Sequence, residues 1–291
     1  MTETKTHTLD VPGATLRYDV RDAETESTAP VLLMIASPME AIGFNTLAGH
    51  FSDRTVVTYD PRGVGRSERI DGATWATPDE HAQDLHRVIS ALGAGPVDIF
   101  ASSGGAVNAL ALVARHPEQV RTLVAHEPPL AQVLPDREQM LAAVADIHET
   151  YERHGLGPGM AKFIALISLK GPIPTDYVDQ PPPNPAHFGL PTEDDGGRDD
   201  PMLGQHIVAV THYEPDFEAL RAASTRIVVG AGAESEGGMT HRAAVAVAEG
   251  LLTEAVTFPS HHGGFLGGEF GQKGDPDAFA ATLRQVLSTT S

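Results

Sequence analysis

Short apolar runs that alternate with helical patterns constrain the fold of this chain more than any other feature. The runs are rich in Val, Ile and Leu and cover residues 31–36, 54–59, 97–101, 120–125, 225–230 and 255–258, after a more alternating run at 15–20. Apolar runs of this length without strict polar alternation are typical of strands buried on both faces of a mostly parallel sheet.

Helical patterns lie between these runs. Residues 77–80 (T-P-D-E) form a capping box with proline at the first helical position, and they begin a predicted helix that ends before Gly93. An alanine-rich helix is expected over 104–115 and a last helix after Asp275. Strands that alternate with helices predict an α/β fold with a doubly wound sheet.

One segment interrupts the alternation. Residues 136–154 and 162–169 have helical periodicity, and residues 171–201 are rich in proline, glycine and acidic residues. We therefore predict a core made of residues 1–130 and 215–291, with residues 131–214, the cap segment, inserted over the carboxyl edge of the sheet. Ligands bind at that edge in open α/β sheets. A surface loop without function is the alternative.

Composition excludes several classes of protein. The 39 acidic and 20 basic residues give a net charge of −19, which opposes binding to nucleic acid or to anionic lipid. The absence of cysteine excludes disulfides, thiolate metal sites and a cysteine nucleophile. No apolar run reaches the roughly 18 residues of a membrane span, and the first residues lack an apolar signal core. We expect a cytoplasmic protein that binds a small-molecule substrate; its oligomeric state stays open.

No motif for a cofactor or a metal is present. Gly63 and Gly65 do not extend to G-x-G-x-x-G, and there is no H-E-x-x-H. Scattered histidines on helix faces are usually solvated. The sequence therefore predicts neither a cofactor nor a metal site.

The strongest functional signal surrounds Ser103. Residues 101–105 (A-S-S-G-G) join a predicted strand to a predicted helix, and small residues at 101 and 105 allow the two backbones to approach closely. This turn would raise the Ser103 hydroxyl above the sheet edge, at a helix N-terminus whose free N–H groups stabilise an anion. A glycine-rich turn without catalytic function is the alternative.

Four ordered segments resemble the α/β-hydrolase superfamily. A-S-S-G-G stands where that family has G-x-S-x-G. The others are 59–67 (Y-D-P-R-G-V-G-R-S), 124–129 (V-A-H-E-P-P) and 258–265 (F-P-S-H-H-G-G-F), which resemble the family's segments after the fourth strand, at the end of the sixth strand and before the last helix. The resemblance covers about residues 8–130 and 215–288. It implies an eight-stranded α/β-hydrolase fold with a serine, acid and histidine triad in that chain order.

The resemblance makes Ser103 the nucleophile. His262, directly before two glycines, matches the family's histidine, and His261 is the alternative. A serine hydroxyl is a weak nucleophile until an adjacent imidazole takes its proton. Surface histidines without a catalytic role are the competing interpretation.

The acid is open among three glutamates. Glu234 is the first choice, because the family places its acid in the loop after the seventh strand. Glu236 in the same loop is one alternative. Glu127, at the end of the sixth strand, is another, because some family members carry the acid there. A triad carboxylate fixes the imidazole tautomer and stabilises the imidazolium.

Two backbone N–H groups should bind the oxyanion. Gly104 directly follows the nucleophile. The second donor should come from the loop after the third strand, where Pro38 has no N–H, so Met39 is expected and Ser37 is the alternative. This loop departs from the glycine-rich sequence common in the family.

These residues predict a cofactor-independent serine hydrolase that cleaves an ester, thioester or lactone of a small molecule through an acyl-enzyme. The atypical Ser37-Pro38-Met39 loop motivates a second hypothesis, in which the same site performs C–C bond hydrolysis, perhydrolysis or a non-hydrolytic rearrangement. A third hypothesis is a non-catalytic protein that binds a small molecule. The sequence does not identify the substrate.

Overall fold

The computed structural model describes residues 3–289, and a nine-stranded sheet forms the centre of this part of the chain. The strand order is β1-β2-β4-β3-β6-β7-β8-β9, with β5 beside β2. The strands are β1 (Thr4–Val11), β2 (Ala14–Arg21), β3 (Leu32–Ser37), β4 (Val56–Asp60), β5 (Glu68–Arg69), β6 (Val97–Ser103), β7 (Val120–His126), β8 (Arg226–Gly232) and β9 (Val256–Phe258). The strands from β4 to β9 along this order run parallel, so the predicted doubly wound, mostly parallel sheet is confirmed, with the two-residue β5 in addition.

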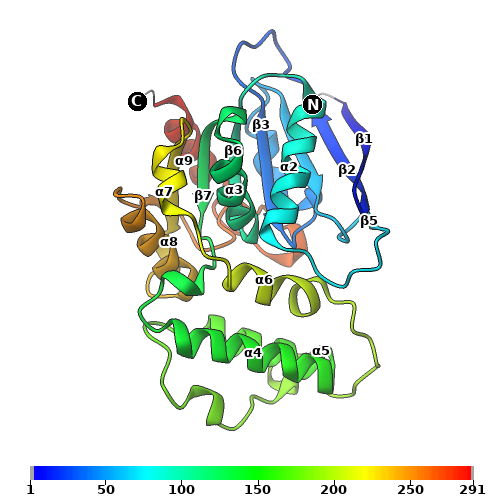
Figure 1. Ribbon diagram of the computed structural model, residues 1–291, viewed down its shortest axis with the longest axis vertical. Coiled ribbons are helices and arrows are strands. Elements are labelled where there is room, and N and C mark those ends of the chain that lie inside the picture. The colour runs from blue at the N-terminus through cyan, green and yellow to red at the C-terminus, as the bar shows by residue number, and fades with distance from the viewer. Residues whose placement is uncertain (1–2, 290–291) are drawn as a thin grey trace.

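Helices connect the parallel strands and cover both faces of the sheet (Figure 1). They are α1 (Asn45–Gly49), α2 (Pro78–Leu92), α3 (Gly104–Arg115), α4 (Arg137–His154), α5 (Leu156–Ile167), α6 (Ile207–Thr211), α7 (Phe217–Ala222), α8 (Met239–Gly250) and α9 (Pro276–Ser288). Thr77 caps α2 as expected, since its hydroxyl accepts a hydrogen bond from the Glu80 N–H, while the Glu80 carboxylate accepts from Arg62 instead of returning a bond to Thr77. Gly93 ends α2 in the left-handed conformation.

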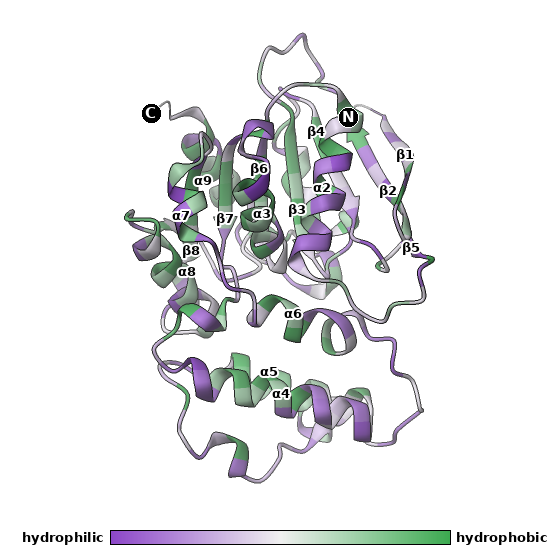
Figure 2. Cartoon of the chain, viewed as in Figure 1, coloured by the Kyte–Doolittle hydropathy of each residue, from purple (hydrophilic) through white to green (hydrophobic). Residues whose placement is uncertain are grey.

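Alternate residues of the buried strands enter two separate hydrophobic cores. Leu33 and Ile35 of β3 belong to the core that also contains residues of α2, α3 and α8, whereas Leu32 and Met34 belong to the core that contains residues of α1 and α9. In Figure 2 the central strands are largely apolar, whereas α2 presents polar residues toward the viewer. Burial on both faces explains why these strands lack polar alternation in the sequence.

The cap segment lies beyond the carboxyl ends of the parallel strands. Its helices α4 and α5 pack together around a third core, which includes Met140, Ile147 and Leu166 (Figure 1). Residues 171–200 contain no long helix or strand, only short turns such as Tyr177–Asp179 and Pro185–Phe188. The Tyr151 hydroxyl accepts a hydrogen bond from the Asp200 N–H at 2.9 Å, which ties this irregular stretch to α4.

None of the helices within residues 3–289 combines the length and the apolarity needed to cross a bilayer.

Candidate active site

A tight turn holds Ser103 between β6 and α3. Its backbone angles are φ 54° and ψ −131°, a conformation that residues other than glycine seldom adopt. A Cβ atom on Gly105 would lie 2.5 Å from the Cα of Ala36, and one on Gly104 would lie 2.6 Å from the carbonyl oxygen of Ser37. The close approach of α3 to β3 thus requires glycine at both positions, and it sets the serine at the carboxyl edge of the sheet.

His262 faces the same edge from the loop that follows β9. Ser103 and His262 both line the walls of two adjoining cavities. The Nδ1 atom of His262 lies 2.6 Å from the Oε2 atom of Glu127. Both ring nitrogens of His261 have backbone partners instead of Glu127. Its Nδ1 accepts a hydrogen bond from the Gly263 N–H at 3.0 Å, and its Nε2 lies 3.2 Å from the Lys273 carbonyl oxygen.

Glu127 is fully buried directly after β7 and is held by three partners. Besides His262, the Gly232 N–H donates to Oε1 and the Thr240 hydroxyl donates to Oε2, each at 2.9 Å. Burial raises the pKa of Glu127, but the hydrogen bond and charge of His262 outweigh this effect and lower the pKa to about 2. A carboxylate that is ionised at neutral pH only accepts hydrogen bonds. The His262 proton therefore lies on Nδ1, which leaves Nε2 free to accept one.

Glu234 was the first choice for the acid that pairs with His262, but the structure places Glu127 beside His262 instead. Glu234 and Glu236 are exposed in the turn after β8, and no hydrogen bond joins either carboxylate to His262 within residues 3–289. The Glu234 N–H donates instead to the Ser260 carbonyl oxygen at 2.9 Å, so this turn supports the histidine loop through its backbone. Glu127, the alternative, is closer because β7 adjoins β6 and ends at the same edge.

The predicted oxyanion donors Gly104 and Met39 each line a cavity that Ser103 also lines. Gly104 is the first residue of α3, so its N–H has no acceptor inside the helix. The Met39 N–H has no backbone acceptor in the described part of the chain, and Met39 lines the smaller cavity together with Ser103. The side chain of the alternative donor, Ser37, has a partner of its own, since its hydroxyl lies 2.9 Å from Nδ1 of His206.

The sequence did not single out Thr240 or Gly232. It indicated Ser37 only as an alternative backbone donor to the oxyanion. Thr240 lies in the first turn of α8, a helix that begins after Gly238 without a side-chain cap and therefore lacks a capping signal. No sequence motif marks Gly232 or the pairing of Ser37 with His206, because both depend on contacts between distant parts of the chain.

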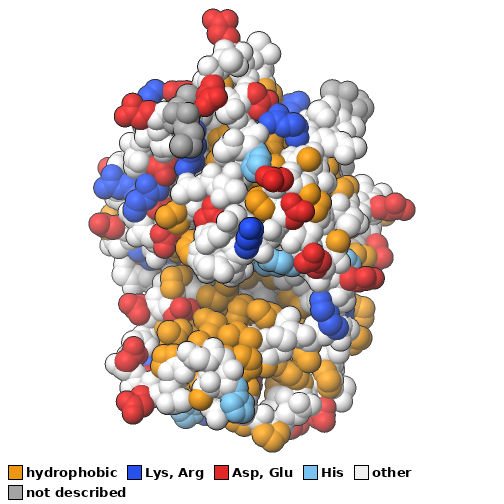
Figure 3. All heavy atoms as spheres, turned by 180° about the vertical axis from the view of Figure 1, so that it is seen from behind, with side chains coloured by type: hydrophobic (Ala, Val, Ile, Leu, Met, Phe, Trp, Pro, Cys, Tyr) orange, Lys and Arg blue, Asp and Glu red, His pale blue; other side chains and the backbone are white. Residues whose placement is uncertain are grey.

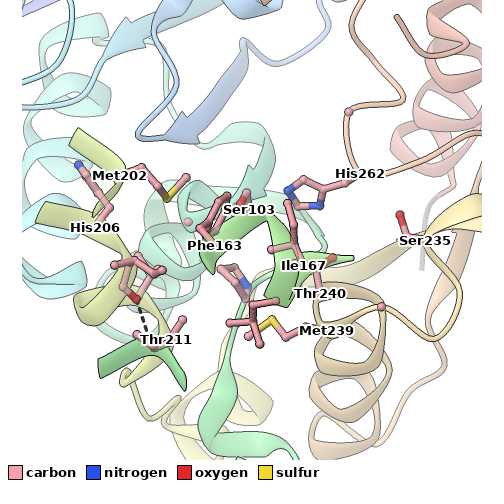
Figure 4. A pocket seen from close by; sticks show the side chains of 18 of the residues that line it. Ser103, Phe163, Ile167, Met202, His206, Thr211, Ser235, Met239, Thr240 and His262 are labelled. Carbon is pink, nitrogen blue, oxygen red and sulfur yellow. Dashed lines mark hydrogen bonds between the residues drawn. The ribbon is translucent and has the colours of Figure 1, made fainter. Parts of the chain in front are cut away.

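The larger cavity, of about 490 Å³, lies between the cap segment and the core. Figure 3 shows hydrophobic side chains gathered around the hollow between these two parts, and Figure 4 shows Ser103 between Met202 and His206 on one side and His262 on the other. The apolar wall contains Pro129, Met140, Val144, Phe163, Leu166, Ile167, Met202, Ile207, Val210 and Met239. The residues of the cap segment that line this cavity include Phe163, Ile167 and His206. The smaller cavity, of about 310 Å³, adjoins Met39 and Phe270.

Comparisons with known proteins identify the family of this chain. Residues 37–167 match the family model described as alpha/beta hydrolase fold. The chain is 31% identical over 266 residues to the uncharacterized hydrolase YraK of Bacillus subtilis (strain 168), covering 89% of each protein. The chain belongs to the alpha/beta hydrolase fold family.

Solved structures share the fold of this α/β hydrolase at low sequence identity. The enol-lactonase from Burkholderia xenovorans LB400 is 16% identical with a TM-score of 0.65, over 97% of this chain and 100% of the other. A thermophilic esterase from Thermogutta terrifontis is 18% identical with a TM-score of 0.64, over 98% of both chains. The resemblance stated from the four sequence segments is thereby confirmed at the level of family and fold.

Proposed function

We propose that this α/β hydrolase is a serine hydrolase that cleaves a carboxylic ester, thioester or lactone of a small molecule through an acyl-enzyme. The observation that carries the proposal is the convergence of Ser103 and the His262–Glu127 pair on one apolar cavity. The esterase and the lactonase that share the fold support this reaction class.

In the proposed mechanism, the Ser103 hydroxyl attacks the carbonyl carbon while Nε2 of His262 takes its proton. Glu127 holds the imidazole in the tautomer that accepts this proton and stabilises the imidazolium that forms. The N–H groups of Gly104 and Met39 bind the oxyanion of the tetrahedral intermediate. One such donor is typically worth about 10²–10³ in rate.

The imidazolium then gives its proton to the leaving oxygen or sulfur, and the C–O or C–S bond breaks to leave an acyl group on Ser103. Water attacks this acyl-enzyme with His262 as the general base, and a second tetrahedral intermediate collapses to the carboxylic acid and free Ser103. A lactone releases its hydroxyl on the same carbon chain.

The cavity favours an apolar group on the substrate. Its cap-side wall is made largely of Met, Val, Leu, Ile and Phe side chains. Burial of an apolar group contributes about 25 cal/mol for each Å² removed from water. An ester with a branched or aromatic group of moderate size is therefore the substrate class that fits best.

Labelling with a fluorophosphonate and intact-mass measurement tests the nucleophile. We expect one adduct on the native protein, none on Ser103→Ala, and a kcat lower by about 10⁴–10⁶ in that variant with short p-nitrophenyl esters. Ser102→Ala is the matched control, since it removes the neighbouring hydroxyl and should keep the adduct. An adduct that persists in Ser103→Ala refutes the assignment. Labelling without ester turnover favours the other chemistries of the same site, and ligand binding without labelling favours a binding protein.

A further inference from the structure

A buried hydrogen bond joins the cap segment to the core beside Ser103. Nδ1 of His206, at the end of the helical turn Pro201–His206, lies 2.9 Å from the hydroxyl of Ser37 at the end of β3. The two residues are only 2% and 4% exposed. Both line the larger cavity together with Ser103, and Figure 4 shows His206 on the side opposite His262.

Ser37 lies next to both the proposed nucleophile and the segment that carries the Met39 N–H. It pairs with Ser103 in the register of β3 and β6, and it lies two residues before Met39. Beyond Met39, the Ala41 N–H donates to the buried carboxylate of Asp60 at 2.7 Å. The segment that carries the Met39 N–H is therefore fixed at one end by the core and at the other by a residue of the cap segment.

The surroundings of His206 suit a fixed, neutral ring. Burial, followed by the nearby charge of Arg69, lowers the pKa of His206 to about 4. Its ring stacks on that of His81, with ring centroids 5.2 Å apart. Because the His206 ring is neutral and stacks on His81, its Nδ1 atom has a fixed position relative to the Ser37 hydroxyl. The geometry of this contact should therefore stay constant around neutral pH.

We propose that His206 is a positioning residue for the reaction: by holding Ser37, it sets the place of the Met39 N–H, so the seating of the cap segment completes the oxyanion site. This inference rests on the proposed function. A displacement of an oxyanion donor by about 1 Å is enough to cost up to about 10²-fold in rate.

A double-mutant cycle on one ester substrate tests the proposal. Ser37→Ala and His206→Phe should each lower kcat by about 10- to 100-fold with KM within about threefold, and the double variant should be no slower than the slower single variant. His206→Gln retains hydrogen-bonding capacity and should recover most of kcat. His187→Phe, an exposed histidine of the cap segment, is the matched control and should keep the native rate.

Several outcomes overturn the proposal. Effects of the two single variants that multiply in the double variant would show that the two side chains act independently. A raised KM at unchanged kcat would assign His206 to substrate binding, and a lowered Tm at unchanged kcat would show a purely structural role.

One measurement separates this inference from the proposed function. If native protein is not labelled by the fluorophosphonate, the proposed function fails, but the contact is still testable by NMR. The amide resonance of Met39 should shift in Ser37→Ala and in His206→Phe and stay in place in His187→Phe. An unshifted Met39 resonance in all three variants overturns the inference whatever the labelling result.

Discussion

Ser103 ends β6 and Glu127 directly follows the neighbouring parallel strand β7, and both residues have positive φ angles, 54° and 48°. Such a conformation costs a side-chain-bearing residue roughly 1–2 kcal/mol. Surrounding contacts hold it: the Glu127 N–H donates to the Gly230 carbonyl oxygen at 3.0 Å, and the carboxylate has three donors. The two side chains that matter most for the proposed chemistry are thus oriented by strained turns at one sheet edge.

At this scale, Glu127→Gln should lower kcat/KM for esters by about 10²–10⁴, because a neutral amide neither fixes the His262 tautomer nor stabilises the imidazolium. Glu234→Gln is the matched control and should stay within about twofold. Steady-state kinetics on one p-nitrophenyl ester measures both. The assignment of the acid to Glu127 is wrong if the loss appears in Glu234→Gln instead.

The resemblance to the α/β-hydrolase family implied that Ser103 and His262 act together, and both residues line the same two cavities. The sequence was insufficient to choose among the glutamates. That choice depends on the Gly232 N–H and the Thr240 hydroxyl, which lie more than 100 residues away from Glu127 along the chain. No local pattern reports such partners.

Among the elements, α3 and β3 approach each other so closely that backbone packs on backbone. A Cβ on Gly105 would meet the Ala36 Cα, the Ala36 nitrogen and the Ile35 oxygen at 2.9 Å or less. Because these are backbone atoms, no side chain can move aside to make room. The N-terminus of α3, and with it the Gly104 N–H, is therefore placed by the fit of helix on strand.

Gly105→Ala should accordingly destabilise the fold by about 3 kcal/mol and slow fluorophosphonate labelling of Ser103, since α3 must shift away from β3. Gly49→Ala is the matched control: nothing lies within 4 Å of the added methyl, so its effect should stay within about 1 kcal/mol. Urea unfolding gives the free energies. Equal stabilities of the two variants would contradict the steric argument.

Elements with strong periodicity could be predicted, and elements without it could not. The helix over 78–92 has a capping box and an apolar stripe, and it forms as predicted. Strand β1 escaped prediction because most of its side chains are exposed, so it has little hydrophobic pattern. Helix α8 escaped because its N-cap is Gly238, which provides no side-chain signal.

For the whole molecule, buried histidines link stability to pH. Burial lowers the pKa of His126 to about 4, although the charge of Glu127 acts in the opposite direction, and His206 has a pKa of about 4 for the reason given above. Each group binds a proton below pH 6.5 when unfolded but only near pH 4 when folded. Their contribution is therefore complete above pH 6.5 and is lost as the pH falls toward 4.

The free energy of unfolding should thus decrease between pH 6.5 and pH 4, with up to about 3 kcal/mol from each fully buried histidine. His126→Phe should flatten this slope, and His187→Phe, at an exposed position, should leave it unchanged. Urea titrations at several pH values measure the slope, which is informative even when the variant differs in absolute stability. A slope unaltered in His126→Phe would contradict the linkage.

The position of the carboxylate on β7 has a consequence for the turn that follows β8. With Glu127 as the partner of His262, the side chains of Glu234 and Ser235 line the larger cavity, while the Glu234 N–H supports the histidine loop. Mutational drift at these two positions can alter which substrates enter while the proton-transfer machinery stays intact. An engineer seeking new selectivity can therefore randomise this turn first, and leave Thr240 and Gly232 untouched.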